Sequence, residues 1–123
     1  MPYDPLHPPD PSQWLALSEG DRLNGVLEFH GPAGAALPNA RLHAALHVTV
    51  ENQVAGGYRA VVEALARLTG DGLDRHEAVH AVGAAVAERL RQVLQSGKPA
   101  FDRVAYESEL AALTAADWKA GAG

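Results

Sequence analysis

Four of the six histidines fall into two pairs with the same four-residue spacing. His43 and His47 form the first pair, and His76 and His80 form the second. Because residues four apart lie on the same side of a helix, each pair predicts two imidazole rings that point in one direction. Two such pairs on neighbouring helices would place four ring nitrogens around one point, as a divalent transition metal requires. We therefore expect all four histidines to be metal ligands.

Three further residues are candidates for the same site. Glu51 continues the row of the first pair by one more turn, Glu77 lies inside the second pair, and His30 stands at the end of a preceding predicted helix. His30 would either add a ligand or lie at the surface. Glu51 or Glu77 would complete the metal shell or orient a histidine ring by hydrogen bonding.

The donor set bears on the identity of the metal. Histidines alone suit zinc, nickel or copper, whereas an added carboxylate makes a mixed shell that also holds iron or manganese, singly or in pairs. We expect zinc first, and iron or manganese second. With a metal-bound water or dioxygen, the chain would be a metal-dependent hydrolase or oxidoreductase, with Glu77 or Glu51 as the proton acceptor.

The second pair also spells His-Glu-Ala-Val-His, the motif of zinc peptidases. In that interpretation the two histidines hold zinc and Glu77 is the catalytic base. Such an enzyme needs a sheet edge to hold the peptide and a third ligand, for which Glu107 or Glu109 has no supporting pattern. Glu77 also stands three residues after Asp74, where it would complete a capping box. A peptidase is therefore the less favoured alternative.

The histidines have a metal-free interpretation as well. Each ring could donate to a neighbouring carbonyl or carboxylate and serve as a satisfied polar group in the core. The chain would then be a helical interaction module, as a monomer or as a homodimer that buries an alanine-rich helix surface. No pattern in the sequence specifies a substrate.

The composition predicts an all-α protein. The chain has 123 residues, 47% of them apolar, which is enough for the core of one domain. Aromatic residues make up only 6%, and alanine is abundant, so small aliphatic side chains must fill the core, as in closely packed helices. We expect a compact bundle of four to five helices with a proline-rich N-terminal arm.

The same counts exclude several classes of function. A net charge of −5 argues against nucleic acid and anionic membrane surfaces as partners, and the absence of cysteine excludes disulfides and thiol chemistry. No apolar run reaches the length of a membrane span, and the first residues lack the features of a signal peptide. We expect a cytoplasmic protein.

The positions of the prolines and the apolar residues divide the chain. Five of the eight prolines lie within residues 1–11, which predicts an extended arm outside the core. A single helical domain should span 12–118, and residues 119–123 should fray. Within the domain, apolar residues at helical spacing predict the central helix pair, 39–54 and 74–96. Further helices are expected near Trp14 and over 18–30, 58–68 and 102–113.

Three stretches resemble a family of small, uncharacterised bacterial helical proteins, a domain of unknown function. They are DPLHPPDPSQWLALSEGDRL, LPNARLHAALHVTVENQVA and GLDRHEAVHAVGAAVAERL. The most specific parts are H-x-x-x-H-x-x-x-E-x-Q, here from His43 to Gln53, and the HExxH stretch from His76. The resemblance covers nearly the whole chain. It implies a bacterial protein of helical type and brings no reaction or substrate.

Overall fold

The computed structural model describes residues 3–35, 39–97 and 101–121, with side chains over 3–29, 39–97 and 101–120. Its described residues form seven helices and no strand, so the predicted all-α fold is confirmed. The helices are α1 (Pro11–Ala16), α2 (Glu19–Ala35), α3 (Ala40–Ala55), α4 (Arg59–Gly70), α5 (Arg75–Ser96), α6 (Arg103–Ala112) and α7 (Ala115–Gly121). Five of them have ten or more residues, in agreement with the expected bundle of four to five helices. The short α1 is the helix expected near Trp14, whereas the short α7 was not expected. Among the described helices, none combines the length and apolar character needed to cross a bilayer.

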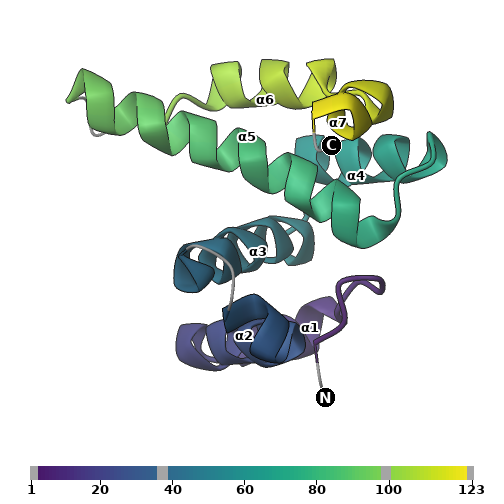
Figure 1. The fold of residues 1–123 in the computed structure, drawn as a ribbon. Helices are drawn as coiled ribbons and strands as arrows, with labels where there is room; N and C mark the ends of the chain where they lie inside the picture. The colour runs from purple at the N-terminus through teal and green to yellow at the C-terminus, as the bar shows by residue number, and fades with distance from the viewer. Residues whose placement is uncertain (1–2, 36–38, 98–100, 122–123) are drawn as a thin grey trace.

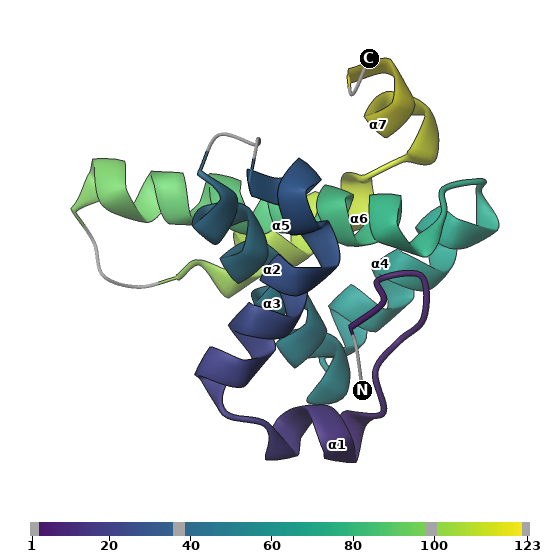
Figure 2. The ribbon, with the colours of Figure 1, turned by 60° about the horizontal axis from the view of Figure 1, so that its bottom comes forward.

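The helices stack in layers around α3 and α5. In Figure 1, α1 and α2 lie on one side of α3, and α5 lies on the other, with α4, α6 and α7 beyond it. Figure 2, turned by 60°, shows α2 lying along α3 and the N-terminal arm curving round before it enters α1. The two central helices are those that carry the histidine pairs, as the sequence predicted.

Local chain chemistry sets the limits of the central helices. Asp74 and Glu77 form a reciprocal capping box at the start of α5, as predicted, with Asp74 accepting from the Glu77 backbone N–H. At the other junction, α3 ends at Ala55, and Gly57 adopts φ +77°, which favours glycine. These contacts define where α5 begins and where α3 ends.

Two apolar clusters hold the layers together. The larger one joins α3, α4, α5 and α6, and includes Val50, Leu68, Val82 and the fully buried Tyr106. The smaller one lies between the arm, α1, α2 and α3. Because α3 contributes to both clusters, one of its faces packs against α4 and α5 while another packs against α1 and α2.

The N-terminal arm is part of this smaller cluster. Residues 3–10 are not helical, as predicted, but the expectation that they lie outside the core is wrong, because Tyr3 and Pro5 are buried. Prolines prevent regular helix without preventing burial, and the Tyr3 ring packs 5.7 Å from the ring of Trp14. The arm therefore contributes to the smaller cluster together with α1, α2 and α3.

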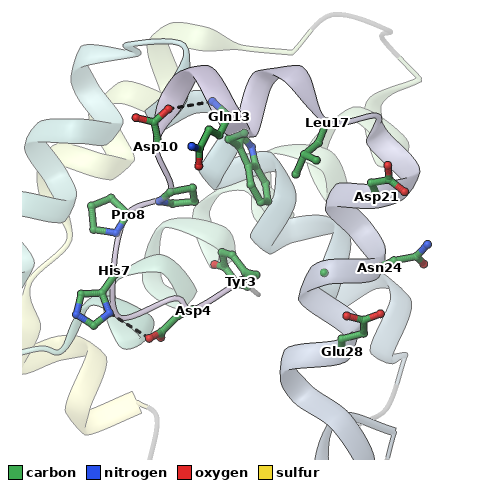
Figure 3. Close-up of a pocket in the computed structure, with 13 residues that line it drawn as sticks. Tyr3, Asp4, His7, Pro8, Asp10, Gln13, Leu17, Asp21, Asn24 and Glu28 are labelled. Atoms are coloured by element: carbon green, nitrogen blue, oxygen red, sulfur yellow. Dashed lines mark hydrogen bonds and ion pairs between the residues drawn. The ribbon is translucent and has the colours of Figure 1, made fainter. Parts of the chain in front are cut away.

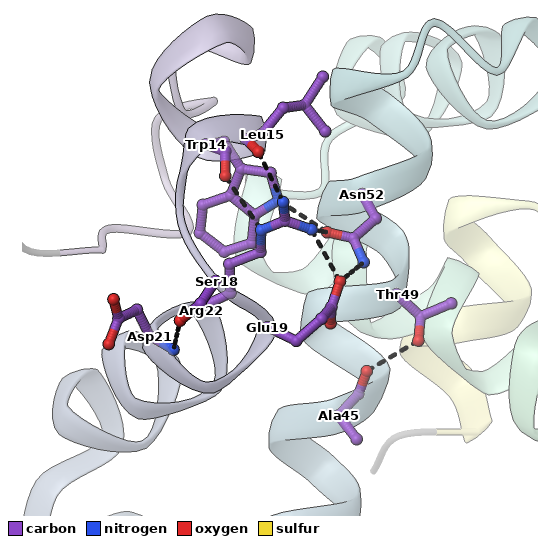
Figure 4. Close-up of polar contacts among 9 residues, drawn as sticks. All are labelled: Trp14, Leu15, Ser18, Glu19, Asp21, Arg22, Ala45, Thr49 and Asn52. Atoms are coloured by element: carbon purple, nitrogen blue, oxygen red, sulfur yellow. Dashed lines mark hydrogen bonds and ion pairs between the residues drawn. The ribbon is translucent and has the colours of Figure 1, made fainter.

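A buried arginine ties α1 and α2 to α3. Arg22 donates to the carbonyl oxygens of Trp14 and Leu15, at 3.0 and 2.9 Å, and to the carboxylate of Glu19 (Figure 4). It also donates to the side chain of Asn52 on α3, which accepts a second hydrogen bond from the Trp14 indole. This network fixes the position from which the arm reaches the central helices.

Two other boundaries differ from the sequence predictions. The helix expected over 102–113 ends at Ala112, and a second helix, α7, continues to Gly121, so the predicted frayed tail from 119 is wrong for its first residues. Thr114 accepts from the Asp117 backbone N–H at the start of α7, and Trp118 packs against the larger cluster. At the other end, α2 continues past His30, which was expected to end it.

Candidate metal centre

The structure brings the two histidine pairs together where α3 crosses α5. The ring centroid of His80 lies 4.6 Å from that of His43, 4.8 Å from that of His47 and 4.3 Å from that of His76. Within the first pair, the rings of His43 and His47 are 5.0 Å apart. The four-residue spacing on each helix thus produces one cluster of imidazole rings between the two helices.

Three of these histidines have nitrogens that converge. His43, His47 and His80 each offer one ring nitrogen, and these atoms all lie within 4.8 Å of one another. Nε2 of His47 and Nε2 of His80 lie 2.8 Å apart. Two ligands of a tetrahedral zinc ion with bonds of 2.0–2.1 Å would stand about 3.3 Å apart. Small shifts of the rings would therefore admit a metal ion.

His76 lies beside this group without belonging to it. Its ring is packed 5.1 Å from the ring of His47 and 5.5 Å edge to face from that of Phe29. Its Nε2 atom is shielded from solvent. The predicted fourth ligand therefore packs against the rings of Phe29, His47 and His80, beside the three converging nitrogens.

Glu51 is the most deeply buried acidic residue of the site, with 1% of its surface exposed. Arg75 donates one hydrogen bond of 2.8 Å to each of its two carboxylate oxygens. Tyr3 donates a third, of 2.6 Å, to Oε2. Because these contacts occupy both oxygens, Glu51 is not placed as a direct metal ligand, and the Tyr3 hydroxyl connects it to His47.

The Tyr3 hydroxyl links this buried ion pair to the histidines. It lies 3.1 Å from Nδ1 of His47, and the two rings meet edge to face. Burial, followed by the neighbouring Glu51 carboxylate, raises the pKa of Tyr3 far above its usual range, so the phenol is neutral at physiological pH. His47 itself is 2% exposed. The contact therefore joins a neutral phenol to a buried imidazole ring.

Neither Tyr3 nor Arg75 was among the site residues predicted from the sequence. Arg75 is largely buried, and its ion pair with Glu51 places it beside the histidines. A signal was present for Arg75, since it precedes His76 directly and so must lie at the end of α5 that approaches Glu51. No signal identified Tyr3, which is separated from His47 by 44 positions.

Glu77 points away from the histidines. Its side chain is exposed and accepts from the Asp74 backbone N–H at 3.3 Å, in the capping box. The described residues contain no β-strand whose edge could bind a peptide substrate. The arrangement that zinc peptidases require around the HExxH motif is therefore not formed by these residues.

The other two histidines, His7 and His30, are not part of the group that the structure shows. His7 is exposed in the arm and pairs with Asp4, with Nδ1 and Oδ2 3.0 Å apart. The side chain of His30 lies outside the described residues, so its role as an additional ligand stays a prediction.

One side of the histidine group borders a hollow of about 240 Å³. Beside His43, His47 and His80, its walls are formed by Leu46, Val79, Gly83, Ala84 and Trp118. No charged side chain is among these described lining residues. A Cβ atom at Gly83 would lie 3.7 Å from the Cβ of Leu46, which is ordinary contact, so the approach of the two helices here does not require glycine.

No protein-family model, curated protein or solved structure matches this chain. The resemblance to small bacterial helical proteins therefore stays a prediction.

Proposed function

We propose that the chain binds one divalent transition metal ion between α3 and α5, through His43, His47 and His80. The observation that carries this proposal is the convergence of one nitrogen from each ring, all within 4.8 Å of one another. One cation bound at this point would accept a lone pair from each of the three imidazoles.

The donor set favours zinc. Glu51 is engaged by Arg75 and Tyr3, so a shell that used its carboxylate would first have to break a buried two-point ion pair. Without that carboxylate the shell is all nitrogen, which suits zinc, nickel or copper better than iron or manganese. Zinc is accordingly the first metal to test.

The position of the hollow favours a site with an exchangeable ligand. Structural zinc sites are closed by four protein ligands, whereas catalytic ones have three and leave one position to water or substrate. Here three nitrogens converge beside a hollow with mostly apolar walls. A metal ion bound there would supply Lewis acidity to a small uncharged molecule, as in a metal-dependent hydrolase.

The test is elemental analysis of tag-free protein purified without chelator, for the wild type and for His47→Ala and His80→Ala. We expect close to one equivalent of transition metal in the wild type and loss of it in both variants. His7→Ala is the matched control, because His7 is an exposed histidine of the arm that lies outside the group. Full metal content in both site variants would contradict the proposal.

A second candidate is a metal-free interaction module. It is favoured by the 2.8 Å separation of the His47 and His80 Nε2 atoms, which is a good hydrogen-bond distance for two neutral rings. Leu94 and Val104 would be its contact residues, since they are 83% and 78% exposed at the end of the α5 and α6 pair. Wild-type protein without metal, together with a dimeric mass in solution, would support this candidate.

A further inference from the structure

The hydroxyl of Tyr3 stands between a carboxylate and a histidine. It approaches Oε2 of Glu51 at 2.6 Å and Nδ1 of His47 at 3.1 Å. A phenol has one proton to donate and lone pairs with which to accept. The short distance to Glu51, a carboxylate that can only accept, assigns the phenol proton to that contact.

Arg75 fixes the carboxylate in this role. Its guanidinium is always charged and donates to both oxygens of Glu51 at 2.8 Å, and its Nη1 also donates to the backbone oxygen of Pro5 at 3.0 Å. The same residue therefore holds Glu51 and the arm that carries Tyr3. Figure 3 shows this arm running from Asp10 at the start of α1, past Pro8 and His7, down to Tyr3.

The N-terminal arm packs against α1 and α2. It forms one wall of a pocket of about 570 Å³ that α1 and α2 complete, and Asp4 accepts from its own neighbours, the Leu6 backbone and the His7 ring (Figure 3). The Tyr3 ring lies between those of Trp14 and Phe29, at 5.7 and 6.2 Å. Its hydroxyl is thereby directed at the centre from outside the two ligand-bearing helices.

Because the phenol donates its only proton to Glu51, it can only accept a hydrogen bond from His47. Nδ1 of His47 must then carry a hydrogen. We propose that Tyr3 is a positioning residue that holds His47 as its Nδ1–H tautomer and so leaves Nε2 as the nitrogen presented to His80 and to a metal ion. Nε2 is the His47 atom that lies 2.8 Å from His80. Outer contacts of this kind orient metal-binding histidines and raise their affinity for the ion.

The part of this inference that concerns metal affinity rests on the proposed function, whereas the tautomer does not. Long-range ¹H–¹⁵N NMR of the histidine rings in metal-free wild-type protein measures the tautomer directly. We expect nitrogen shifts of the Nδ1–H form for His47, and a mixture of forms in Tyr3→Phe, which keeps the ring and removes the hydroxyl. His47 found as the Nε2–H form in the wild type would overturn the proposal, whether or not metal binds.

Zinc affinity, measured by competition with a chromophoric chelator, is the second readout. We expect Tyr3→Phe to bind zinc about 10- to 100-fold more weakly than the wild type, the usual effect of losing such a contact. Tyr58→Phe is the matched control, because Tyr58 also donates to a carboxylate, that of Glu107 at 2.9 Å, away from the histidines. Equal affinities in the two variants, in protein that binds zinc, would overturn the positioning role. If the wild type binds no zinc, the proposed function fails and the tautomer measurement still decides this inference.

Discussion

Arg75 holds Glu51 through two hydrogen bonds of 2.8 Å, one to each carboxylate oxygen, with 12% of the Arg75 side chain and none of the Glu51 side chain exposed. This buried ion pair joins the start of α5 to α3 just beyond the histidines. It takes the acidic residue nearest the site out of direct coordination and turns it into a support for Tyr3.

The ion pair predicts a large loss of stability when one partner is neutralised. Glu51→Gln leaves the Arg75 charge buried without its counter-charge, so we expect the free energy of unfolding to fall by about 3 kcal/mol. Denaturant unfolding followed by circular dichroism measures it. Glu63→Gln is the matched control, because Glu63 pairs with Arg59 on the exposed face of α4. That change should cost less than about 0.5 kcal/mol, and equal losses in the two variants would refute the distinction.

His76 and His80 are predicted to differ in metal binding although they belong to one sequence motif. Because His43, His47 and His80 converge without His76, His76→Ala should retain close to the wild-type metal content, whereas His80→Ala should lose it. Elemental analysis of the folded variants decides between three ligands and four. Equal loss in both would show that His76 completes the shell.

Glu77 is predicted to act on helix stability alone. Glu77→Ala removes one exposed capping contact, so the free energy of unfolding should fall by less than about 1 kcal/mol while metal content stays unchanged. Chemical denaturation and elemental analysis on the same sample provide both numbers. Peptide cleavage by the wild type that disappears in this variant would instead support the HExxH peptidase.

The hollow beside the histidines predicts an exchangeable position on the metal. In cobalt-substituted protein, the visible absorption reports the coordination of the ion, and we expect added azide to change it. The physical reason is that three protein ligands leave at least one position of a tetrahedral ion to a small molecule. A spectrum that does not respond to azide would indicate a closed, structural site.

Alkaline pH should destabilise the fold through Tyr106. Burial raises the pKa of Tyr106, and its hydrogen bond to Gln53 offsets this only in part. Since the folded pKa is above the unfolded one, the stability from the neutral phenol is complete below about pH 10 and is lost as the pH rises further. Unfolding measured at several pH values should show a shallower alkaline decline for Tyr106→Phe than for the wild type. Identical declines would contradict this assignment.

Part of the site was predictable because it depends on local geometry. The spacing of His43 and His47, and of His76 and His80, fixes the side of each helix on which the rings lie, and apolar periodicity predicted that these two helices form the central pair. The capping box at Asp74 is equally local, since its partners are three residues apart. Such features follow from the helical repeat whatever the rest of the chain does.

What the sequence by itself determined is therefore an all-α chain with two histidine pairs on its central helices. Only the tertiary structure decided three features of the site. Tyr3 contacts His47, which lies 44 positions away in the sequence, and Arg75 pairs with Glu51, which lies 24 positions away. His76 is not one of the three histidines whose nitrogens converge. The physical reason is that these contacts depend on how α3, α5 and the arm pack. The helical repeat fixes the direction of a side chain on its own helix, but the packing of separate elements fixes which groups meet.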